Sequence, residues 1–279
     1  MTRVGWIGLG AMGAPMAACA ARAGHELRAF DLDPERVPDG VEPADSAADA
    51  AHEANVLALM VATPDQAEQA LSDAAPDDRT IVLVMATVGP EPVTRWAREH
   101  EVVDAPVSGG VARAGDGDLL IMVSGAAESI ERVQPLLDTL ARTAAVVGET
   151  PGDGQKVKLV NQLLCGVHIA AAAEALAFAD ALGLDARGCW EVLRDGAAAS
   201  FMLDDRGERM LDEAFEPPKS ALDIFVKDMG LVMAAARDGG QPSPLAAAAE
   251  QLYLAGSRAG LGRLDDSSLI TLFRSQASP

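Results

Sequence analysis

Short apolar runs alternate with amphipathic, alanine-rich segments through the first half of the chain. The first run begins at residue 3, and others follow at residues 26–31, 55–61 and 80–85. The last two are apolar after their first residue, which predicts strands buried on both faces of a parallel sheet. Strands that alternate with helices at this spacing predict a doubly wound α/β sheet of the Rossmann type, whose ligands bind at the carboxyl ends of the strands.

The pattern changes near residue 150. Before it, residues 101–107, 119–124 and 145–147 complete the expected strands. After it, residues 155–182 form one apolar helix, about 40 Å long at 1.5 Å per residue, and every later segment has helical periodicity. We therefore expect a dinucleotide-binding Rossmann domain over residues 1–154 and an all-α domain over residues 155–279, joined by a long interdomain helix.

Three glycines follow the first strand and open a helix. Gly8 permits a tight turn, Gly10 lets the backbone approach a pyrophosphate, and Gly13 lets helix and strand pack closely. Asp31 ends the second strand, where an acid accepts hydrogen bonds from an adenosine ribose. Asp33 adds a carboxylate that would repel a 2′-phosphate, so the sequence predicts NAD rather than NADP. The expected cofactor-binding residues of this domain are Gly8, Leu9, Gly10, Ala11, Met12, Gly13, Asp31, Leu32, Met60, Val61 and Thr87.

Composition narrows the class of partner. A net charge of −20 argues against nucleic acid and anionic membranes, which attract basic surfaces, but it allows a small anion in one local pocket. Cys19, Cys165 and Cys189 show no close pairing, so we expect no disulfide framework or zinc site, and a reducing cytoplasm fits. The histidines are scattered and predict no metal centre. No apolar run approaches eighteen residues, so no membrane span is expected.

Lysine is scarce in this chain, yet two of its four lysines fall at the start of the long helix. Lys158, Asn161 and Gln162 stand at positions i, i+3 and i+4 and therefore share a helix face. One cation and two amides on one face suit a substrate that carries hydroxyl or carbonyl oxygens. The alternative interpretation is a capped helix start with a solvated lysine.

A second candidate for substrate binding follows the strand at residues 101–107. Ser108, Gly109 and Gly110 supply a hydroxyl group and unobstructed backbone N–H groups, which together can bind a carboxylate. The alternative is an ordinary glycine turn.

These motifs together resemble the β-hydroxyacid dehydrogenase family, which includes 3-hydroxyisobutyrate dehydrogenase and tartronate semialdehyde reductase. The likeness covers essentially the whole chain and rests on residues 8–13, 104–110, 154–158 and 227–228. It implies the two-domain fold described above, assembly into homodimers or homotetramers, and a small carboxylate substrate. It adds nothing that points to nucleic acid or a membrane as a partner.

The resemblance also implies roles for individual residues. Lys158 would be the catalytic residue, with Asn161 beside it. Thr87 and Lys227 would touch the cofactor, while Ser108, Gly109, Gly110 and Gln162 would bind the substrate. Many family members have two consecutive asparagines where this chain has Asn161 and Gln162, so which amide touches the substrate stays open.

The expected substrate is a four-carbon polyhydroxy acid, L-threonate or a close relative. Residues 160–176 and 220–228 resemble the branch of the family that acts on it. In addition, Ser108, Asn161 and Gln162 offer more polar groups than an aliphatic acid could satisfy, and each unpaired buried donor costs about 1–3 kcal/mol. The nearest alternatives are 3-hydroxyisobutyrate oxidation and tartronate semialdehyde reduction.

Two further alternatives differ in class. An imine-reducing relative would share the fold. The resemblance implies that such proteins have a different residue at the position of Lys158, so Lys158 argues against this alternative. A non-enzymatic dinucleotide-binding module is the other alternative. A short-chain dehydrogenase with Tyr-x-x-x-Lys chemistry is excluded, because Ser257 stands four residues after Tyr253, the one tyrosine of the chain.

Overall fold

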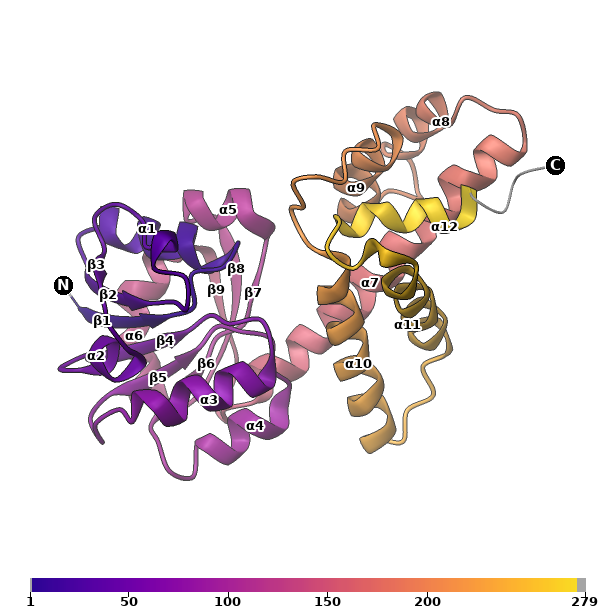
Figure 1. Cartoon of the computed structure of the whole chain (residues 1–279). Helices are drawn as coiled ribbons and strands as arrows, with labels where there is room; N and C mark the ends of the chain where they lie inside the picture. Colours follow the sequence, from indigo (N-terminus) through magenta and orange to yellow (C-terminus); the bar gives the residue numbers. More distant parts are fainter. Residues whose placement is uncertain (1, 275–279) are drawn as a thin grey trace. The chain divides into compact units, whose positions relative to one another are not determined.

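The computed structural model describes residues 2–274 and divides the chain into two compact units, Met1–Lys158 and Leu159–Pro279. Figure 1 shows strands and helices in the first unit and helices in the second. The predicted fold class, a Rossmann domain followed by an all-helical domain, is confirmed. The structure divides the chain after Lys158, four residues later than the sequence suggested. The reason is that the first turn of the long helix is bonded to the sheet of the first unit.

The first unit is built on one twisted sheet with the strand order β3-β2-β1-β4-β5-β6-β8-β7, and β9 pairs with β8. The order reverses between β1 and β4, which is the switch point of a doubly wound sheet. Strands β1 to β6 pair in parallel, whereas β8 runs antiparallel to β6 and β7. The strands are β1 (Arg3–Ile7), β2 (Glu26–Phe30), β3 (Glu42–Pro43), β4 (Val56–Leu59), β5 (Ile81–Val84), β6 (Val102–Asp104), β7 (Val107–Ser108), β8 (Leu119–Ser124) and β9 (Ala141–Gly148).

Helices cover both faces of this sheet because strand side chains alternate between two apolar clusters. One cluster joins Trp6 to Met16 and Leu136 on α1 and α6. The other joins Leu57 to Leu71 on α3 and Trp96 on α4. The helices of the first unit are α1 (Gly13–Arg22), α2 (Ala47–Ala51), α3 (Pro64–Ala74), α4 (Pro90–Trp96), α5 (Gly110–Asp116) and α6 (Ala127–Leu140), with a 3₁₀ turn at Pro34–Arg36.

The second unit packs its helices around an apolar core. Tyr253 and Phe225 stack with ring centroids 5.2 Å apart, and the buried Tyr253 hydroxyl donates to the carbonyl of Gly166 at 2.9 Å. The helices are α7 (Asp153–Ala181), α8 (Ala186–Leu193), α9 (Phe201–Leu211), α10 (Leu222–Asp238), α11 (Pro244–Gly256) and α12 (Ile270–Arg274), with a π turn at Ser257–Leu261 and a 3₁₀ turn at Asp266–Leu269.

Three short elements are not predicted by the hydrophobic periodicity of the sequence. β3 and β7 have two residues each, too few for an alternation to register. α5 begins at Gly110, inside the stretch expected to be a glycine loop. Its glycines lower helix propensity, but they also permit the positive φ values of 147° at Gly109 and 79° at Gly110.

Helix α7 differs from the sequence expectation in one respect. It is long and apolar enough to cross a membrane by length and composition, with a mean hydropathy of 1.5 over its best window. In the structure 44% of that window is buried. An alanine-rich core helix meets the same criterion, because alanine raises mean hydropathy without forming a continuous run of large apolar side chains.

Candidate active site

The glycine loop between β1 and α1 has the shape that a dinucleotide requires. A Cβ on Gly8, whose φ is +97°, would lie 2.4 Å from the carbonyl oxygen of Met60, and one on Gly13 would lie 2.0 Å from that of Gly8. Both contacts are far too short, so both positions need glycine. A Cβ on Gly10 would meet nothing within 4 Å. The space over Gly10 is therefore open for a pyrophosphate at the N-terminal end of α1.

Asp31 lies at the carboxyl end of β2, beside this loop. Its Oδ2 accepts from the N–H of Leu9 at 2.7 Å, and its Oδ1 accepts from the N–H of Asp33 at 3.0 Å. These bonds fix the carboxylate where a ribose would reach it. Leu32 is 92% exposed at the same edge, which leaves an apolar surface available to an adenine ring. Asp33 holds Arg36 in an ion pair at 3.1 Å.

Met60 and Val61 follow β4, and Thr87 follows β5, so all three lie at the carboxyl edge as expected. The Thr87 segment, residues 86–89, is hydrogen-bonded to a side chain from α7. The Gln155 amide donates from Nε2 to the carbonyl of Ala86 at 3.0 Å and accepts at Oε1 from the N–H groups of Val88 at 3.0 Å and Gly89 at 3.1 Å. Thr87 sits between these anchored residues.

The first turn of α7 is capped by side chains from the sheet. The fully buried carboxylate of Asp104, at the end of β6, accepts at Oδ2 from the N–H of Gly152 at 3.1 Å and of Gln155 at 2.8 Å. The Oγ of Ser124, at the end of β8, accepts from the N–H of Gly154 at 2.9 Å. The N–H of Asp153 donates to a carbonyl in the preceding turn. The donors that a helix start usually leaves unsatisfied therefore have protein acceptors.

Burial and hydrogen bonding act in opposite directions on Asp104. Desolvation is the larger effect and raises the pKa of this carboxyl to about 6, while bonds from Gln155, Gly152 and Ser124 favour the charged form. The donors in these bonds are uncharged amides and a hydroxyl. Asp104 is therefore ionised at pH 7, and its negative charge lies at the positive end of the α7 dipole.

Lys158 stands three residues after Gln155, so the two side chains share a face of α7. The residue is 7% exposed, which excludes the solvated lysine considered as an alternative. Lys158 belongs to the same compact unit as the glycine loop and the Ser108 segment, residues 108–110. The structure therefore places the predicted catalytic lysine at a buried position, directly after the capped first turn of α7.

Ser108 ends β7, and Gly109 and Gly110 turn the chain into α5. A Cβ on Gly110 would meet nothing within 4 Å, so the space beside this backbone is open. A Cβ on Gly109 would lie 3.0 Å from a methyl of Leu119. Gly109 is thus required for local packing, and substituting it would not test substrate binding alone.

The two amides after Lys158 belong to the second unit and have different environments. Gln162 is buried, and its Nε2 donates to Oδ2 of Asp228 while its Oε1 accepts from Asn161 Nδ2 at 2.8 Å. The other oxygen of Asp228 pairs with Lys227 Nζ at 2.7 Å. Asn161 is half-buried, and its Oδ1 makes no hydrogen bond recorded for residues 2–274. The Gln162 amide is thus occupied within the protein, and the Asn161 carbonyl is the better candidate acceptor.

Comparison with known proteins assigns the family. Residues 3–148 match the family model for the NAD-binding domain of 6-phosphogluconate dehydrogenase. Residues 152–273 match the model described as NAD-binding of NADP-dependent 3-hydroxyisobutyrate dehydrogenase. The L-threonate dehydrogenase of Cupriavidus necator is 40% identical, with 97% of this chain and 95% of that protein covered. The chain belongs to the β-hydroxyacid dehydrogenase family.

Two further relatives show the breadth of substrates among similar proteins. The 2-hydroxy-3-oxopropionate reductase of Escherichia coli is 34% identical over 96% of each chain. A crystal structure of 3-hydroxyisobutyrate dehydrogenase from Salmonella typhimurium superposes with a TM-score of 0.91 at 35% identity, covering 98% of this chain and 100% of that one. This β-hydroxyacid dehydrogenase is therefore an oxidoreductase with an NAD-binding domain, while its substrate is left open by these names.

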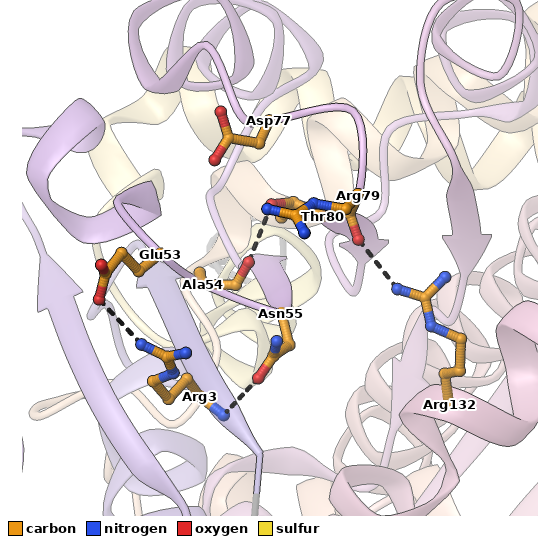
Figure 2. A pocket seen from close by; sticks show the side chains of 8 residues that line it. All are labelled: Arg3, Glu53, Ala54, Asn55, Asp77, Arg79, Thr80 and Arg132. Atoms are coloured by element: carbon orange, nitrogen blue, oxygen red, sulfur yellow. Dashed lines mark hydrogen bonds and ion pairs between the residues drawn. The ribbon is translucent and has the colours of Figure 1, made fainter.

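A cavity of about 380 Å³ lies elsewhere, at the amino ends of the strands (Figure 2). Two of its three arginines have carboxylate partners, since Arg3 pairs with Glu53 at 2.8 Å and Arg132 pairs with Glu101 at 2.7 Å. Ligands of doubly wound sheets bind at the opposite edge, so we do not assign this cavity to the reaction. It is lined by Arg3, Glu53, Ala54, Asn55, Asp77, Arg79, Thr80 and Arg132.

Sequence reasoning did not give Asp104 or Gln155 a role of their own, although both lie in the motifs that identified the family. The missed signal was a polar residue inside an otherwise apolar strand, Asp104 after Val102 and Val103. A buried carboxylate needs donors, and here its donors come from a segment 48 to 51 residues away.

Proposed function

We propose that this protein oxidises a short hydroxy acid, L-threonate or a close relative, with NAD as hydride acceptor and Lys158 as the catalytic residue. The observation that carries the proposal is the buried position of Lys158 on a capped helix start in the same unit as the dinucleotide loop. A lysine removed from water in that setting favours a chemical role over a solvated one.

The residues of this chain divide the work as follows. Bound NAD supplies the carbon that accepts the hydride. Lys158 Nζ binds the reacting hydroxyl and takes its proton as the C–H bond breaks, so that a carbonyl forms and the lysine becomes an ammonium ion. Asn161 Oδ1 accepts a hydrogen bond from a substrate hydroxyl and aligns it. Proton transfer of this kind contributes about 10²–10⁴-fold to a rate.

The substrate carboxylate is proposed to bind at Ser108 and at the N–H groups of Gly109 and Gly110. The open space beside Gly110 supports this assignment. Ser108→Ala should raise KM for the acid by about 10- to 100-fold, because one charge-assisted hydrogen bond is worth about 1.5–3 kcal/mol, while the affinity for NAD should not change. Equal activity on the matching alcohol without a carboxylate would contradict the assignment.

L-threonate is proposed on the strength of the relatives that bear that name. The polarity argument made from the sequence is weaker than expected, because Gln162 bonds to Asp228 and Asn161. We propose that Gln162 orients Asn161 and that Asn161 contacts the substrate. Comparing kcat/KM for L-threonate, D-glycerate and 3-hydroxyisobutyrate at saturating NAD tests the choice. A preference for 3-hydroxyisobutyrate would overturn the substrate and leave the family unchanged.

NAD is proposed over NADP because Asp31 and Asp33 place two carboxylates at the ribose end of the site. Arg36, the first cation after these carboxylates, pairs with Asp33, so a 2′-phosphate would have to compete with that carboxylate for it. Lys227 retains its proposed cofactor role, which rests on the family resemblance. Steady-state kinetics with both cofactors decide the matter, and a higher kcat/KM with NADP would be the contrary result.

We further propose that the protein forms a homodimer or homotetramer and acts in the cytoplasm on a small carboxylate. Its three cysteines are free, as a reducing compartment allows. Val160, Leu164 and Phe178 are 64%, 49% and 62% exposed along α7 and fall near one face of the helix. A second copy of the chain would cover them. Phe178→Glu should lower the mass measured by light scattering, whereas an unchanged mass would refute this face as the interface.

The decisive test of the reaction compares two lysines on one helical turn. Lys158→Ala should reduce kcat by about 10²–10⁴-fold while NAD still binds. Lys156→Ala is the matched control, because Lys156 is exposed and pairs only locally with Asp153 at 2.8 Å; its kcat should stay within about twofold of the parent. Near-normal turnover by a folded Lys158→Ala protein would rule the mechanism out.

A further inference from the structure

One buried side-chain pair connects the three segments that carry the proposed chemistry. Asp104 ends β6 and leads through Pro106 into the Ser108 segment. Gln155 lies in the first turn of α7, one turn before Lys158. Asp104 Oδ1 accepts from Gln155 Nε2 at 2.8 Å, and both residues are fully buried.

The Gln155 amide has no hydrogen-bonding capacity to spare. Its Oε1 accepts from the N–H groups of Val88 and Gly89, and its Nε2 donates to the Ala86 carbonyl and to Asp104. An amide has two donor hydrogens and two acceptor lone pairs, and here all four are satisfied. The orientation of the amide is therefore fixed by its neighbours, and any rotation breaks several bonds at once.

The backbone around the pair is equally constrained. A Cβ on Gly154 would lie 2.5 Å from the carbonyl oxygen of Met122 and 2.9 Å from Oδ2 of Asp104. The helix start thus lies directly against β8 and the Asp104 carboxylate. A small shift of this turn along the helix axis would move Lys158 with it.

We infer that Asp104 and Gln155 are positioning residues that set the place of Lys158 relative to the Thr87 segment and the Ser108 segment. The inference rests on the proposed catalytic role of Lys158. Asp104 fixes the position of the first turn of α7 along the helix axis, because it accepts from the N–H groups of Gly152 and Gln155. Gln155 then ties that turn to the chain on both sides of Thr87.

If Asp104 acted only as a helix cap, its substitution would have a different effect on activity. Any group that accepts from the N–H groups of Gly152 and Gln155 would stabilise the helix start equally well. A positioning role also requires the side-chain bond between residues 104 and 155, because that bond links the helix to the Thr87 segment. The direction of the bond can be reversed, with the amide at 104 and the carboxylate at 155, and this reversal separates the two roles.

The experiment measures kcat, KM for NAD and folded fraction for Asp104→Asn, Gln155→Glu and the double variant carrying both. Asp104→Asn sets an amide nitrogen against Gln155 Nε2, and Gln155→Glu sets a second carboxylate against Asp104. Each single variant should lose at least tenfold in kcat, with a smaller rise in KM for NAD because the chain around Thr87 is also loosened. The double variant restores a donor facing an acceptor between residues 104 and 155, although the bond to the Ala86 carbonyl stays lost as in Gln155→Glu. Its kcat should therefore exceed that of Gln155→Glu.

Ser129→Ala is the matched control. The Ser129 hydroxyl is buried and donates to the Glu101 carboxylate at 2.7 Å, near the opposite end of β6. Its loss should lower the melting temperature and leave kcat unchanged. Should Asp104→Asn not fold, Gln155→Met keeps the bonds from the N–H groups of residues 152 and 155 to Asp104. It removes the side-chain bonds to Asp104 and to the Thr87 segment, and should show the same fall in kcat.

Two results would overturn the inference while leaving the proposed function intact. In the first, Lys158→Ala is inactive, but the folded single variants turn over within twofold of the parent. In the second, the double variant is no better than Gln155→Glu, which shares its lost bond to Ala86. An active Lys158→Ala protein would instead overturn the proposed function, so the two failures are distinguishable.

Discussion

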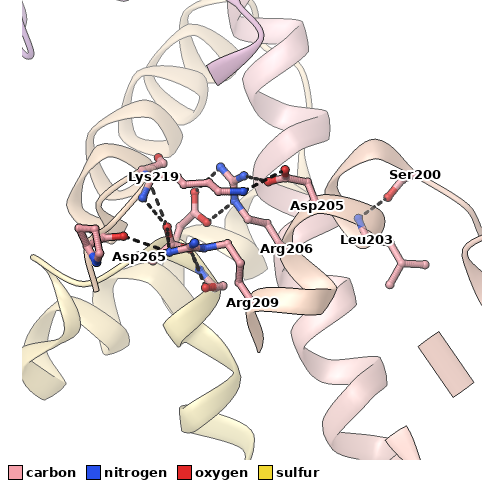
Figure 3. Close-up of polar contacts among 11 residues, drawn as sticks. Ser200, Leu203, Asp205, Arg206, Arg209, Lys219 and Asp265 are labelled. Atoms are coloured by element: carbon pink, nitrogen blue, oxygen red, sulfur yellow. Dashed lines mark hydrogen bonds and ion pairs between the residues drawn. The ribbon is translucent and has the colours of Figure 1, made fainter. Parts of the chain in front are cut away.

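The two units each bury aspartates, and they satisfy them in opposite ways. In the first unit Asp104 accepts hydrogen bonds from uncharged amides and a hydroxyl. In the second, Asp266 accepts from the guanidinium of Arg206, with Nε to Oδ1 at 2.6 Å, and Asp265 pairs with Arg209 at 3.1 Å. Figure 3 shows the second arrangement, where Asp205 and Lys219 complete the ionic cluster.

The electrostatics of the two arrangements differ accordingly. Burial raises the pKa of Asp104 to about 6. Burial also opposes ionisation of Asp265, but hydrogen bonds from Ser267 and Arg209 outweigh it and lower its pKa. For Arg206 burial alone would lower the pKa, and attraction to Asp266 outweighs it, so the pKa is raised. Burial raises the pKa of Asp266 as well, despite its bonds from Arg206. The ionic cluster therefore favours the charged form of Asp265 and Arg206, but not of both its aspartates.

This difference matches what each arrangement has to do. The ionic cluster ties α9 to the segments before α10 and before α12, which is a scaffold function. The Asp104 arrangement joins short backbone segments next to the proposed reaction centre, where directional amide bonds specify position more narrowly than charge attraction does. Four predictions test this difference between the two units.

The largest expected effect is in the ionic cluster. Arg206→Leu leaves the buried Asp266 without its partner and should lower the free energy of unfolding by about 3–5 kcal/mol, measured by urea titration. Adding Asp266→Asn removes the unpaired charge and should recover part of the loss. A cost below about 1 kcal/mol for the single variant would show that the cluster contributes little to the scaffold.

The second prediction concerns pH. Because the folded-state pKa of Asp104 is raised from 3.8 to about 6, the folded protein holds a proton between these values that the unfolded chain has lost. The Asp104 contribution to stability is therefore largest below pH 4 and falls as pH rises to about 6, by about 3 kcal/mol in all.

Unfolding free energies of the parent and Asp104→Asn, measured from pH 4 to pH 7, isolate this contribution. The parent should lose stability relative to the variant up to about pH 6, and the difference should then stay level. Asp265 supplies the contrast: its lowered pKa stabilises the fold at neutral pH, and that contribution disappears as pH falls. A pH-independent difference for Asp104→Asn would show that its carboxyl is not perturbed by burial.

A smaller effect is expected at Ser124. Ser124→Ala removes the acceptor of the Gly154 N–H and should cost about 1–2 kcal/mol, the usual penalty for leaving a buried donor unsatisfied. Thermal unfolding measures it, with Ser129→Ala as a comparison from the same unit. An increase in stability would mean that the helix start has another acceptor available.

The smallest effect is expected at the amino edge of the sheet. Arg3 and Glu53 are 53% and 66% exposed, and exposed pairs contribute about 0–1 kcal/mol. Arg3→Gln should therefore change the unfolding free energy by less than about 1 kcal/mol, with little dependence on salt. A larger loss would show that the Arg3–Glu53 pair stabilises the sheet more than its exposure suggests.

The sequence alone determined the fold class and the dinucleotide loop. Gly8 and Gly13 are dictated by backbone contacts that no side chain could fit, and such positions are recognisable because glycine is required at fixed spacing. The buried strands and the long helix were equally predictable, since apolar periodicity reports local burial directly. Family membership followed from the same motifs.

Only the tertiary structure decided which polar groups meet. Asp104 finds Gln155 across 51 residues, and Gln162 finds Asp228 across 66. The pattern of polar and apolar residues cannot identify such partners. A buried polar residue must have a donor or acceptor, but nothing in the sequence specifies which segment supplies it. For the same reason the sequence left Asn161 and Gln162 equivalent, whereas the fold gives Gln162 a protein partner and leaves the Asn161 carbonyl available.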